Sequence, residues 1–269
     1  MTNSNLVQKY GPWVTVTGAS SGIGRAFALK LASQGFNVHI TGRNQQSLAD
    51  LKEQLSEQAQ TLIHSTIADL STDDGIECLI HDANTLDVGL LVHAAGAESH
   101  GAFNDGDINH ELSLLDLNIR STYRLAHHFS EKFVARGKGG ILLVSSLTGH
   151  FHSPYFANYA SSKSYVLTLG NSLHHELKSK GVDVSVLSPG LTYTPMYEKI
   201  AKDIDWSKTP MKASSPEFVV EYALKSFPRK VNIIPGTGNR ISAVFGQRLL
   251  PRFFGKQNES LFRKAMKAH

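Results

Sequence analysis

Short runs of apolar and β-branched residues alternate along the chain with longer segments of helical spacing. The runs cover residues 13–18, 37–42, 61–69, 90–96, 140–146, 182–190 and 231–236, and several are apolar at consecutive positions. Consecutive apolar positions are typical of strands that are buried on both faces. Helical spacing covers about 23–34, 45–58, 73–83, 104–136, 155–180 and 215–227. The alternation predicts a doubly wound α/β fold with a mostly parallel seven-stranded sheet.

The domain organisation follows from the absence of any internal repeat or low-complexity linker in the sequence. We expect a single domain in which residues 1–236 bind a dinucleotide and carry the catalytic groups. Residues 237–269 are expected to be a basic C-terminal extension of the same domain. The long connection at about 191–216 is expected to be a substrate lid, because a loop of that length is usually functional.

Composition excludes several classes of protein. The chain has 269 residues, 41% of them hydrophobic, which is enough for a sizeable core and argues against disorder. Cys78 is the single cysteine, and the N-terminal residues lack the apolar stretch of a signal peptide, which predicts a cytoplasmic protein. The sequence contains no run of about 18 apolar residues, so no membrane-spanning helix is predicted.

The net charge of +4 is distributed unevenly. Residues 229–269 contain nine Lys or Arg and one acidic residue, a formal charge of +8, whereas the preceding residues carry −4. A general nucleic-acid surface on the folded body therefore has little support, and no nucleic-acid partner is expected.

A glycine-rich turn, TGASSGIG at 17–24, follows the first predicted strand and opens the first predicted helix. A dinucleotide pyrophosphate needs close backbone approach and free N–H groups at a helix N-terminus. The spacing is G-x-x-x-G-x-G, and Arg25 and Ala26 stand where a P-loop would have Lys and Ser or Thr. The turn predicts a dinucleotide site with these contacts: Gly18, Ser20, Ser21, Gly22, Ile23 and Gly24.

The residue after the second strand bears on the choice between NAD and NADP. An acidic residue there suits the 2′-hydroxyl of NAD, and a basic one suits the 2′-phosphate of NADP. The sequence has Arg43 at this place and no acidic residue before Asp50. It could be a solvated loop residue, but its position favours NADP(H).

A Ser, Tyr and Lys set supplies the candidate chemistry. Tyr159 and Lys163 lie four residues apart on one face of a predicted helix, and Ser146 ends the fifth predicted strand. A lysine ammonium about 4–6 Å away would favour the phenolate by roughly two to three pKa units. That shift would bring the tyrosine into range for proton transfer. Ligands bind beyond the carboxyl ends of parallel strands, so Ser146 is expected to face the glycine turn.

Taken together, these motifs resemble those of NADP-preferring short-chain dehydrogenases/reductases, over roughly residues 10–236. The resemblance implies a Rossmann-like fold and hydride transfer between NADP(H) and a carbonyl or secondary alcohol. It implies that Tyr159 is the acid/base, that Lys163 tunes it and holds the nicotinamide ribose, and that Ser146 orients the carbonyl. Further positions match the family's proton-relay asparagine, its adenine contact and its nicotinamide loop: Asn118, Asp69, Pro189, Gly190 and Thr194.

One family motif departs from the usual pattern. Such chains commonly read NNAG after the fourth strand, whereas this one reads HAAG, with His93 and Ala94 replacing the asparagines and Ala95 and Gly96 retained. Ala95 and Gly96 are still expected to contact the cofactor. The hydrogen bonds that steady this turn become the open question.

The substrate side is predicted from aromatic and apolar residues near the lid. These could line a pocket for a hydrophobic ketone or aldehyde, or could pack the lid itself: Phe151, Tyr155, Phe156, Tyr193, Met196, Tyr197 and Trp206. The thirteen histidines lack a metal-binding motif, so they are expected to be surface or packing residues, with no metal.

Two other functions remain open at this point. One is a nucleotide sensor or scaffold that keeps the fold without the chemistry. The other is a membrane-peripheral reductase of lipid or acyl carbonyls, because the basic tail has an amphipathic pattern: Arg240, Ile241, Val244, Phe245, Arg248, Leu249, Arg252 and Lys256. The tail could equally pack against a second subunit or cap the substrate entrance. Resemblance to the family implies a homodimer or homotetramer.

Overall fold

The computed structural model describes residues 5–245 and 251–267. Its strands are β1 (Trp13–Thr17), β2 (Asn37–Gly42), β3 (Ile63–Ile67), β4 (Val88–His93), β5 (Gly139–Val144), β6 (Val182–Leu187) and β7 (Asn232–Ile233). All neighbours pair in parallel, in the order β3-β2-β1-β4-β5-β6-β7. The predicted parallel seven-stranded sheet is confirmed, although β7 is much shorter than the predicted run.

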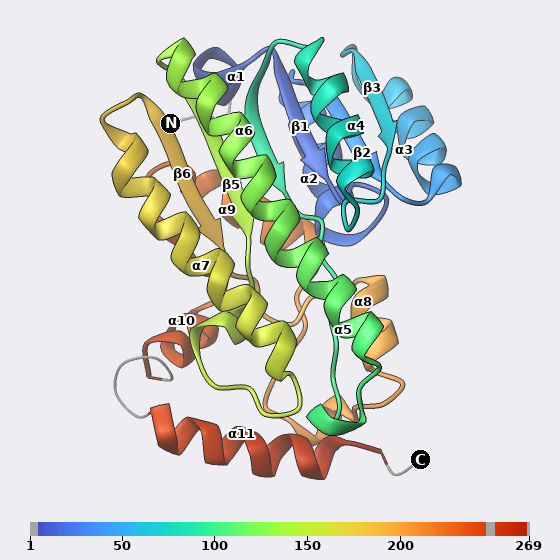
Figure 1. Ribbon diagram of the computed structural model, residues 1–269, viewed down its shortest axis with the longest axis vertical. Coiled ribbons are helices and arrows are strands. Elements are labelled where there is room, and N and C mark those ends of the chain that lie inside the picture. The colour runs from blue at the N-terminus through green and yellow to red at the C-terminus, as the bar shows by residue number, and fades with distance from the viewer. Residues whose placement is uncertain (1–4, 246–250, 268–269) are drawn as a thin grey trace.

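Helices cover both faces of the sheet, as Figure 1 shows. The helices are α1 (Asn5–Tyr10), α2 (Gly22–Ser33), α3 (Gln45–Gln58), α4 (Asp73–Asn84), α5 (Ile108–Leu115), α6 (Ser121–Arg136), α7 (Ala157–Lys178), α8 (Pro195–Ile200), α9 (Pro216–Ser226), α10 (Thr237–Val244) and α11 (Pro251–Ala265). Short turns are η1 (Phe103–Asp105), η3 (Leu147–His150) and η4 (Trp206–Lys208), and η2 (Asp116–Arg120) is a π-helical turn.

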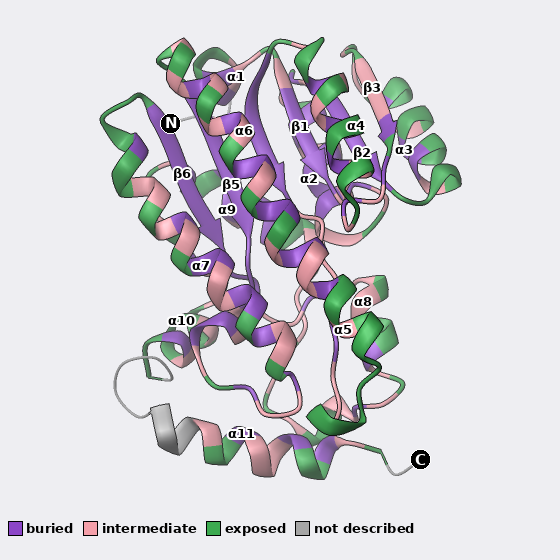
Figure 2. Ribbon diagram, in the orientation of Figure 1, coloured by how far each residue is buried: buried purple, intermediate pink, exposed green. Residues whose placement is uncertain are grey.

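Two separate apolar clusters fill the two sides of the sheet. One joins α2, α3 and α9 to the sheet, and the other joins α4, α6 and α7 to the opposite face. Figure 2 shows the central strands as mostly buried and the edge strand β3 as largely of intermediate burial, with many exposed residues on the outer faces of the helices. This arrangement explains why the strand runs are apolar at consecutive positions.

The segment predicted as one helix at 104–136 is divided. It begins with η1, continues as α5, and passes through the π-helical η2 into α6. Thr122 Oγ1 donates to the carbonyl of Asn118, 2.7 Å away, and Ser121 donates to the carbonyl of Leu117. Both hydroxyls thus bond the backbone within this irregular turn, a pattern that the 3.6-residue periodicity of the sequence does not reveal.

A third apolar cluster lies beyond the carboxyl ends of the strands. Phe262 and Ala265 of α11 pack there against Phe156, Ile200 and Ile204. In Figure 1, α11 runs across this end of the molecule, below α7 and α8. Part of the basic tail is therefore a structural layer over the lid. Arg248 and Leu249, and the side chain of Arg252, lie outside the described residues. Among the described helices, none is long and apolar enough to cross a bilayer.

Candidate active site

A cavity of about 340 Å³ opens at the carboxyl ends of the strands. It brings together the predicted cofactor and catalytic residues Gly18, Ser20, Ser21, Gly22, Ile23, Gly24, Arg43, Ala95, Gly96, Ser146, Tyr159, Lys163, Pro189, Gly190 and Thr194. Two predicted site residues, Asn118 and Asp69, lie outside its lining. The strand topology therefore gathers residues that are far apart in the sequence at one edge of the sheet.

The glycine turn packs closely on neighbouring backbone. Gly18 has a left-handed φ of 65°, and a Cβ there would lie 2.8 Å from the backbone of Ala95. A Cβ on Gly24 would lie 2.3 Å from the Gly18 carbonyl oxygen. These glycines let α2 begin directly against the end of β1, with its N-terminus toward the cavity. The turn fits the pyrophosphate of a dinucleotide.

The HAAG turn is held by a chain of hydrogen bonds. Thr17 Oγ1 accepts from the backbone N–H groups of Ala94 and Ala95 at 3.1 and 3.0 Å. Its own hydroxyl proton is thus available to His93 Nδ1, 2.9 Å away. His93 Nε2 then donates to Thr122 Oγ1 at 3.0 Å. Thr17 and His93 therefore supply the bonding that the absent asparagines left in question.

This chain requires a neutral His93. One ring nitrogen accepts and the other donates, which is the state of an uncharged imidazole. Complete burial, with a smaller contribution from the positive charge of Lys163, lowers the pKa of His93 to about 3. The geometry and the electrostatics thus agree on the neutral form, with the proton on Nε2.

Asn118 supports the loop that follows this turn. Its Oδ1 accepts from the N–H of Ala97 at 2.9 Å, and its Nδ2 donates to the Ala97 carbonyl and to Ser162 Oγ, each at 2.9 Å. A Cβ on Gly96 would lie 3.2 Å from Asn118 Oδ1 and 3.1 Å from Lys163 Nζ. Asn118 therefore lies just behind Gly96, close to the lysine, and does not line the cavity.

The catalytic candidates lie on α7 and at the end of β5. The Lys163 ammonium lies 5.9 Å from the centroid of the Tyr159 ring and donates to the Val144 carbonyl at 3.1 Å. Ser146 Oγ accepts from the backbone N–H and the hydroxyl of Thr148, at 3.2 and 2.9 Å. With these two acceptor positions used, the Ser146 hydroxyl proton is directed to Tyr159, with which it forms a hydrogen bond, or to a substrate oxygen in its place.

The family model described as short chain dehydrogenase matches residues 12–205, a stretch that contains the glycine turn and all three catalytic candidates. The chain belongs to the short-chain dehydrogenase family. It is 33% identical over 236 residues to a 7beta-hydroxysteroid dehydrogenase of Clostridium sardiniense, covering 88% of this chain and 90% of that one. It is therefore an oxidoreductase of the kind that transfers hydride between a nicotinamide and a carbonyl or alcohol of a small molecule.

Solved structures give the same assignment. One, from a study of 7beta-hydroxysteroid dehydrogenase stereoselectivity, has a TM-score of 0.85 and 26% identity, with 94% of this chain and 99% of that chain covered. Another is a short-chain dehydrogenase from Sphingobium yanoikuyae in complex with NADPH, with a TM-score of 0.80 and 25% identity over 96% of this chain and 98% of that chain. The Rossmann-like fold is thereby confirmed for this short-chain dehydrogenase.

The pKa values at the catalytic centre differ from the expectation. Burial raises the pKa of Tyr159 to about 12, a hydrogen bond with Ser146 acts in the opposite direction, and the negative charge of Glu98 raises it further. Burial also lowers the pKa of Lys163 to about 8. The predicted lowering by Lys163 is therefore wrong for this arrangement, because desolvation of the phenolate dominates. Tyr159 is a neutral phenol, ready to donate a proton.

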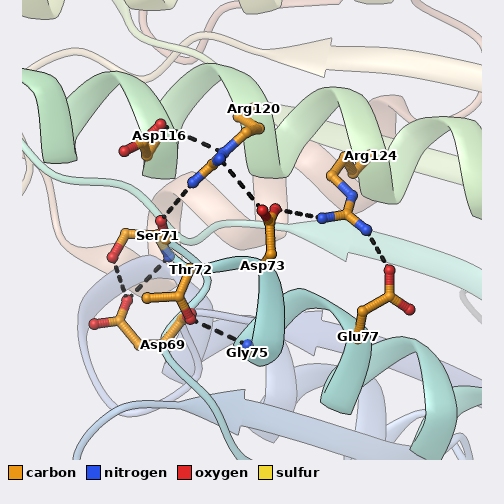
Figure 3. Close-up of polar contacts among 9 residues, drawn as sticks. All are labelled: Asp69, Ser71, Thr72, Asp73, Gly75, Glu77, Asp116, Arg120 and Arg124. Atoms are coloured by element: carbon orange, nitrogen blue, oxygen red, sulfur yellow. Dashed lines mark hydrogen bonds and ion pairs between the residues drawn. The ribbon is translucent and has the colours of Figure 1, made fainter.

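The adenosine end of the cavity carries Arg43 directly after β2. Its guanidinium lies 3.7 Å from Asp69 Oδ2, and both side chains are largely exposed. Burial opposes ionisation of Asp69, but hydrogen bonds from Ser71 and the charge of Arg43 lower its pKa. Arg120 donates to the Ser71 carbonyl at 3.1 Å, as Figure 3 shows. Arg43 thus lies at the rim of the cavity in this short-chain dehydrogenase, and Asp69 lies beside it, just outside the lining.

Further charged contacts lie within η2 and join α6 to the start of α4. Arg120 Nε lies 3.3 Å from Asp116 Oδ1, and Arg124 bonds both Asp73 and Glu77. Figure 3 shows these arginines, at the end of η2 and in the first turn of α6, reaching toward the start of α4. The π-helical turn that contains Asn118 is thereby connected to the loop that carries Asp69.

The other half of the cavity is apolar. Five of the predicted pocket residues line it: Phe151, Phe156, Met196, Tyr197 and Trp206. Tyr193 is 56% exposed and packs against Tyr197, and Tyr155 lines a different cavity and packs on the third cluster, so these two fit the alternative of packing residues. Both lie beside lining residues in the sequence, but the backbone directs them elsewhere.

Sequence reasoning also missed several lining residues, among them Ile200, Met211 and Phe262. The first two are in the lid, where the amphipathic turn of α8 offered a weak signal. Phe262 comes from α11, and its ring packs against that of Phe156 with 5.0 Å between centroids. The amphipathic pattern of the tail was the one sequence signal for Phe262. That pattern was equally consistent with binding to a membrane surface or packing against a second subunit.

Among the described residues, one set of side chains has the spacing of a metal site: His39, His64 and Asp82. His39 is buried, and its two ring nitrogens lie 3.2 Å from Thr15 Oγ1 and 2.9 Å from Thr66 Oγ1. Thr66 in turn donates to Asp82. The threonines thus satisfy His39 as a packing residue, and the metal-free chemistry remains a prediction.

Proposed function

We propose that this short-chain dehydrogenase is an NADP(H)-dependent reductase of bulky hydrophobic ketones, with steroid-like ketones as the leading class. One observation carries the proposal. A single cavity has the glycine turn and Arg43 at one end, an apolar wall at the other, and Ser146, Tyr159 and Lys163 between them. The three parts correspond to dinucleotide, substrate and reacting centre.

The residues around the glycine turn fit a dinucleotide, which when bound supplies the hydride for the carbonyl carbon. Ser146 transfers its hydrogen bond from Tyr159 to the carbonyl oxygen of the substrate, and Tyr159 donates a proton to that oxygen. Lys163, beside Asn118, is placed to hold the ribose and to return a proton to the tyrosine. In the oxidative direction the same groups act in reverse, with Tyr159 accepting the alcohol proton.

The substrate class is supported by the lining of the cavity. Aromatic and thioether side chains from the lid and α11 leave few polar groups away from the reacting centre, which favours a large apolar ligand. A relative named 7beta-hydroxysteroid dehydrogenase, matched over 88% of this chain and 90% of its own, supports the same substrate class. The predicted lid at 191–216 and the tail at 237–269 then act together as the substrate side of one domain.

The cofactor preference is supported by Arg43. A guanidinium at the adenosine rim suits a 2′-phosphate. The negative charge of Asp69 beside it is offset by the positive charge of that guanidinium. The NADPH complex of a related short-chain dehydrogenase is consistent with this preference.

The test compares Tyr159→Phe with a matched control, Tyr155→Phe, in the neighbouring turn. NADPH oxidation with a panel of steroid, aromatic and small polar ketones should fall by about two to four orders of magnitude only in the first variant. Binding of NADPH, followed by its fluorescence, should persist in both. A sensor or scaffold would be indifferent to Tyr159→Phe, and equal turnover of small polar and bulky ketones would refute the substrate class.

The C-terminal tail bears on the alternative of a membrane-peripheral reductase. Because Phe262 lines the cavity and packs on Phe156, a cap over the substrate entrance is favoured over membrane attachment. Sedimentation with anionic vesicles, comparing the full chain with the same chain ending at Gly238, tests the alternative. Binding that depends on the tail would support a peripheral reductase.

A further inference from the structure

A partly buried histidine next to the active site lies between two carboxylates. His100, in the loop after β4, has Nδ1 2.9 Å from Glu98 Oε2 and Nε2 2.9 Å from Asp203 Oδ2. The side chain of Glu98 is 2% exposed and that of His100 10%, whereas that of Asp203 is 35% exposed. Glu98 belongs to the loop on the floor of the site, and Asp203 belongs to the lid.

Proton counting fixes the state in which this bridge is complete. Ionised carboxylates only accept hydrogen bonds, so both ring nitrogens must carry a proton. A neutral imidazole would present one lone pair to a carboxylate oxygen at 2.9 Å, which is repulsive. The bridge therefore requires the imidazolium, and charge-assisted bonds of this kind are the stronger class.

The bridge joins three parts of the substrate side. The His100 ring lies 5.8 Å, between centroids, from that of Phe156, which lines the cavity at the start of α7. The lid segment next to Asp203 pairs with the end of α11, through an antiparallel bridge between Ile204 and Met266. The N–H of Lys267 donates to the Asp203 carbonyl at 2.8 Å. Loss of the bridge would therefore remove one of two charged links between the lid and Glu98, the other being that of Lys199, while leaving the lid attached to α11.

We propose that His100 is a positioning residue that latches the lid to the active-site floor through Glu98 and Asp203, and that loss of its proton releases the lid. The latch couples access of a bulky substrate to pH. Its kinetic consequence rests on the proposed function, because it assumes that the lid covers the substrate. The conformational consequence does not.

The direction of the pH effect follows from the groups that face His100. The hydrogen bond to Glu98 raises the pKa of His100, burial opposes this, and Asp203 raises it further. Lys199 of α8 lies 3.4 Å from Glu98 Oε1 and offsets part of that charge. Tyr159 of α7 is uncharged, as argued above, and the Lys267 ammonium donates to the Ala201 carbonyl. The latch is thus closed below the raised pKa of His100 and opens as the pH rises through it.

The experiment follows the lid directly, without substrate. The chain has two tryptophans, so Trp13→Phe leaves Trp206 in the lid as the fluorescent reporter. Trp206 stacks on Tyr197, with 6.1 Å between ring centroids, and its indole nitrogen is buried. From pH 6 to 9 its emission should shift to the red, and hydrogen exchange of residues 195–208 should accelerate, as the lid opens.

Three variants in this background separate the latch from a structural role. His100→Gln should hold the lid open at every pH. Asp203→Asn offers an amide N–H to the ring nitrogen, so a neutral histidine completes the bridge and the emission should stay constant across the range. His127→Gln removes an exposed histidine paired with Glu131 at 3.4 Å and should behave as the parent.

Kinetics supply the second readout. For a bulky ketone, KM should rise on the order of tenfold from pH 6 to 9 in the parent, with a smaller change in kcat, and this rise should vanish in Asp203→Asn. A parent whose Trp206 emission and lid exchange are unchanged by pH would overturn the latch, as would pH dependence retained in Asp203→Asn. If the emission responds and no ketone is turned over, the latch stands and the proposed function fails.

Discussion

A single hydroxyl, that of Thr17, does most of the bonding at the turn after β4. It accepts from two backbone N–H groups and donates to His93, and the chain continues through Thr122 to the Asn118 carbonyl. Three of these side chains come from different elements, β1, β4 and α6. A departure from a family motif is therefore compensated by residues that the motif does not include.

Thr17→Val should destabilise the protein by about 2–4 kcal/mol, because it leaves two backbone N–H groups and a ring nitrogen without their partner. Urea unfolding followed by circular dichroism measures this. The matched control is Thr41→Val, at the paired position of β2. The Thr41 hydroxyl is buried and has no partner among the described residues, so this change should be neutral or stabilising. Equal losses in both variants would contradict the role given to Thr17.

Arg43→Ala should raise the KM for NADPH about tenfold or more while changing the KM for NADH little, because only NADPH has a 2′-phosphate for the guanidinium. Steady-state kinetics with both cofactors on the same preparation measures the change, and NADH serves as the internal control. A similar increase for both cofactors would show that Arg43 supports the rim in general and does not read the phosphate.

The local motifs explain which site residues the sequence could predict. Tyr159 and Lys163 are one helical turn apart, and the glycine turn is continuous, so each motif determines its own geometry. Asp69 and Asn118 were predicted by resemblance, and the structure places both just outside the cavity. The pKa of Tyr159 could not be foreseen, because spacing reveals the nearby ammonium but not the depth of burial.

At the scale of elements, the pattern identified the strands and most helices but not the irregular parts. The predicted helix at 104–136 is interrupted by η2, and the predicted lid contains α8 and η4. The irregular η2 involves hydrogen bonds from side-chain hydroxyls to the backbone, and the lid elements pack against α11. Sequence periodicity reveals neither kind of contact. Periodicity also could not show that α11 folds back over the lid, since an amphipathic helix fits several partners equally well.

Phe262→Ala should raise the KM for a bulky ketone several-fold and leave that for a small ketone nearly unchanged. The side chain is 3% exposed and forms part of the apolar wall, in a cluster separate from the two that stabilise the sheet. Phe218→Ala, at a 45% exposed position of α9, is the control. Ketones of graded size measure the effect, and a uniform loss for all sizes would indicate that α11 supports the catalytic centre itself.

At the scale of the whole molecule, the alternation of strands and helices predicted the sheet because buried parallel strands need apolar residues on both faces. The strand order arises from crossovers that no local pattern encodes. The structure also locates part of the excess positive charge. The described part of the basic tail packs over the lid by its apolar face. A cytoplasmic location and a homodimer or homotetramer remain predictions.

Acid should destabilise the whole fold through two histidines whose pKa values burial lowers strongly, His39 and His93. Burial lowers the pKa of His39 to about 4 and that of His93 to about 3, whereas both titrate near 6.5 when unfolded. The unfolded chain therefore binds more protons below pH 6.5, so the free energy of unfolding falls as the pH drops toward the folded values. Each histidine contributes a slope of up to about 1.4 kcal/mol per pH unit.

Urea titrations between pH 4.5 and 5.5 test this, because there His100, with its raised pKa, is charged in both states and adds no slope. His93→Asn, which restores the residue usual in the family, should reduce the slope by about one proton, roughly 1.4 kcal/mol per pH unit. His127→Gln, at an exposed position, should leave it unchanged. An unaltered slope in His93→Asn would mean that His93 is protonated in the folded protein, which its bonds to Thr17 and Thr122 forbid.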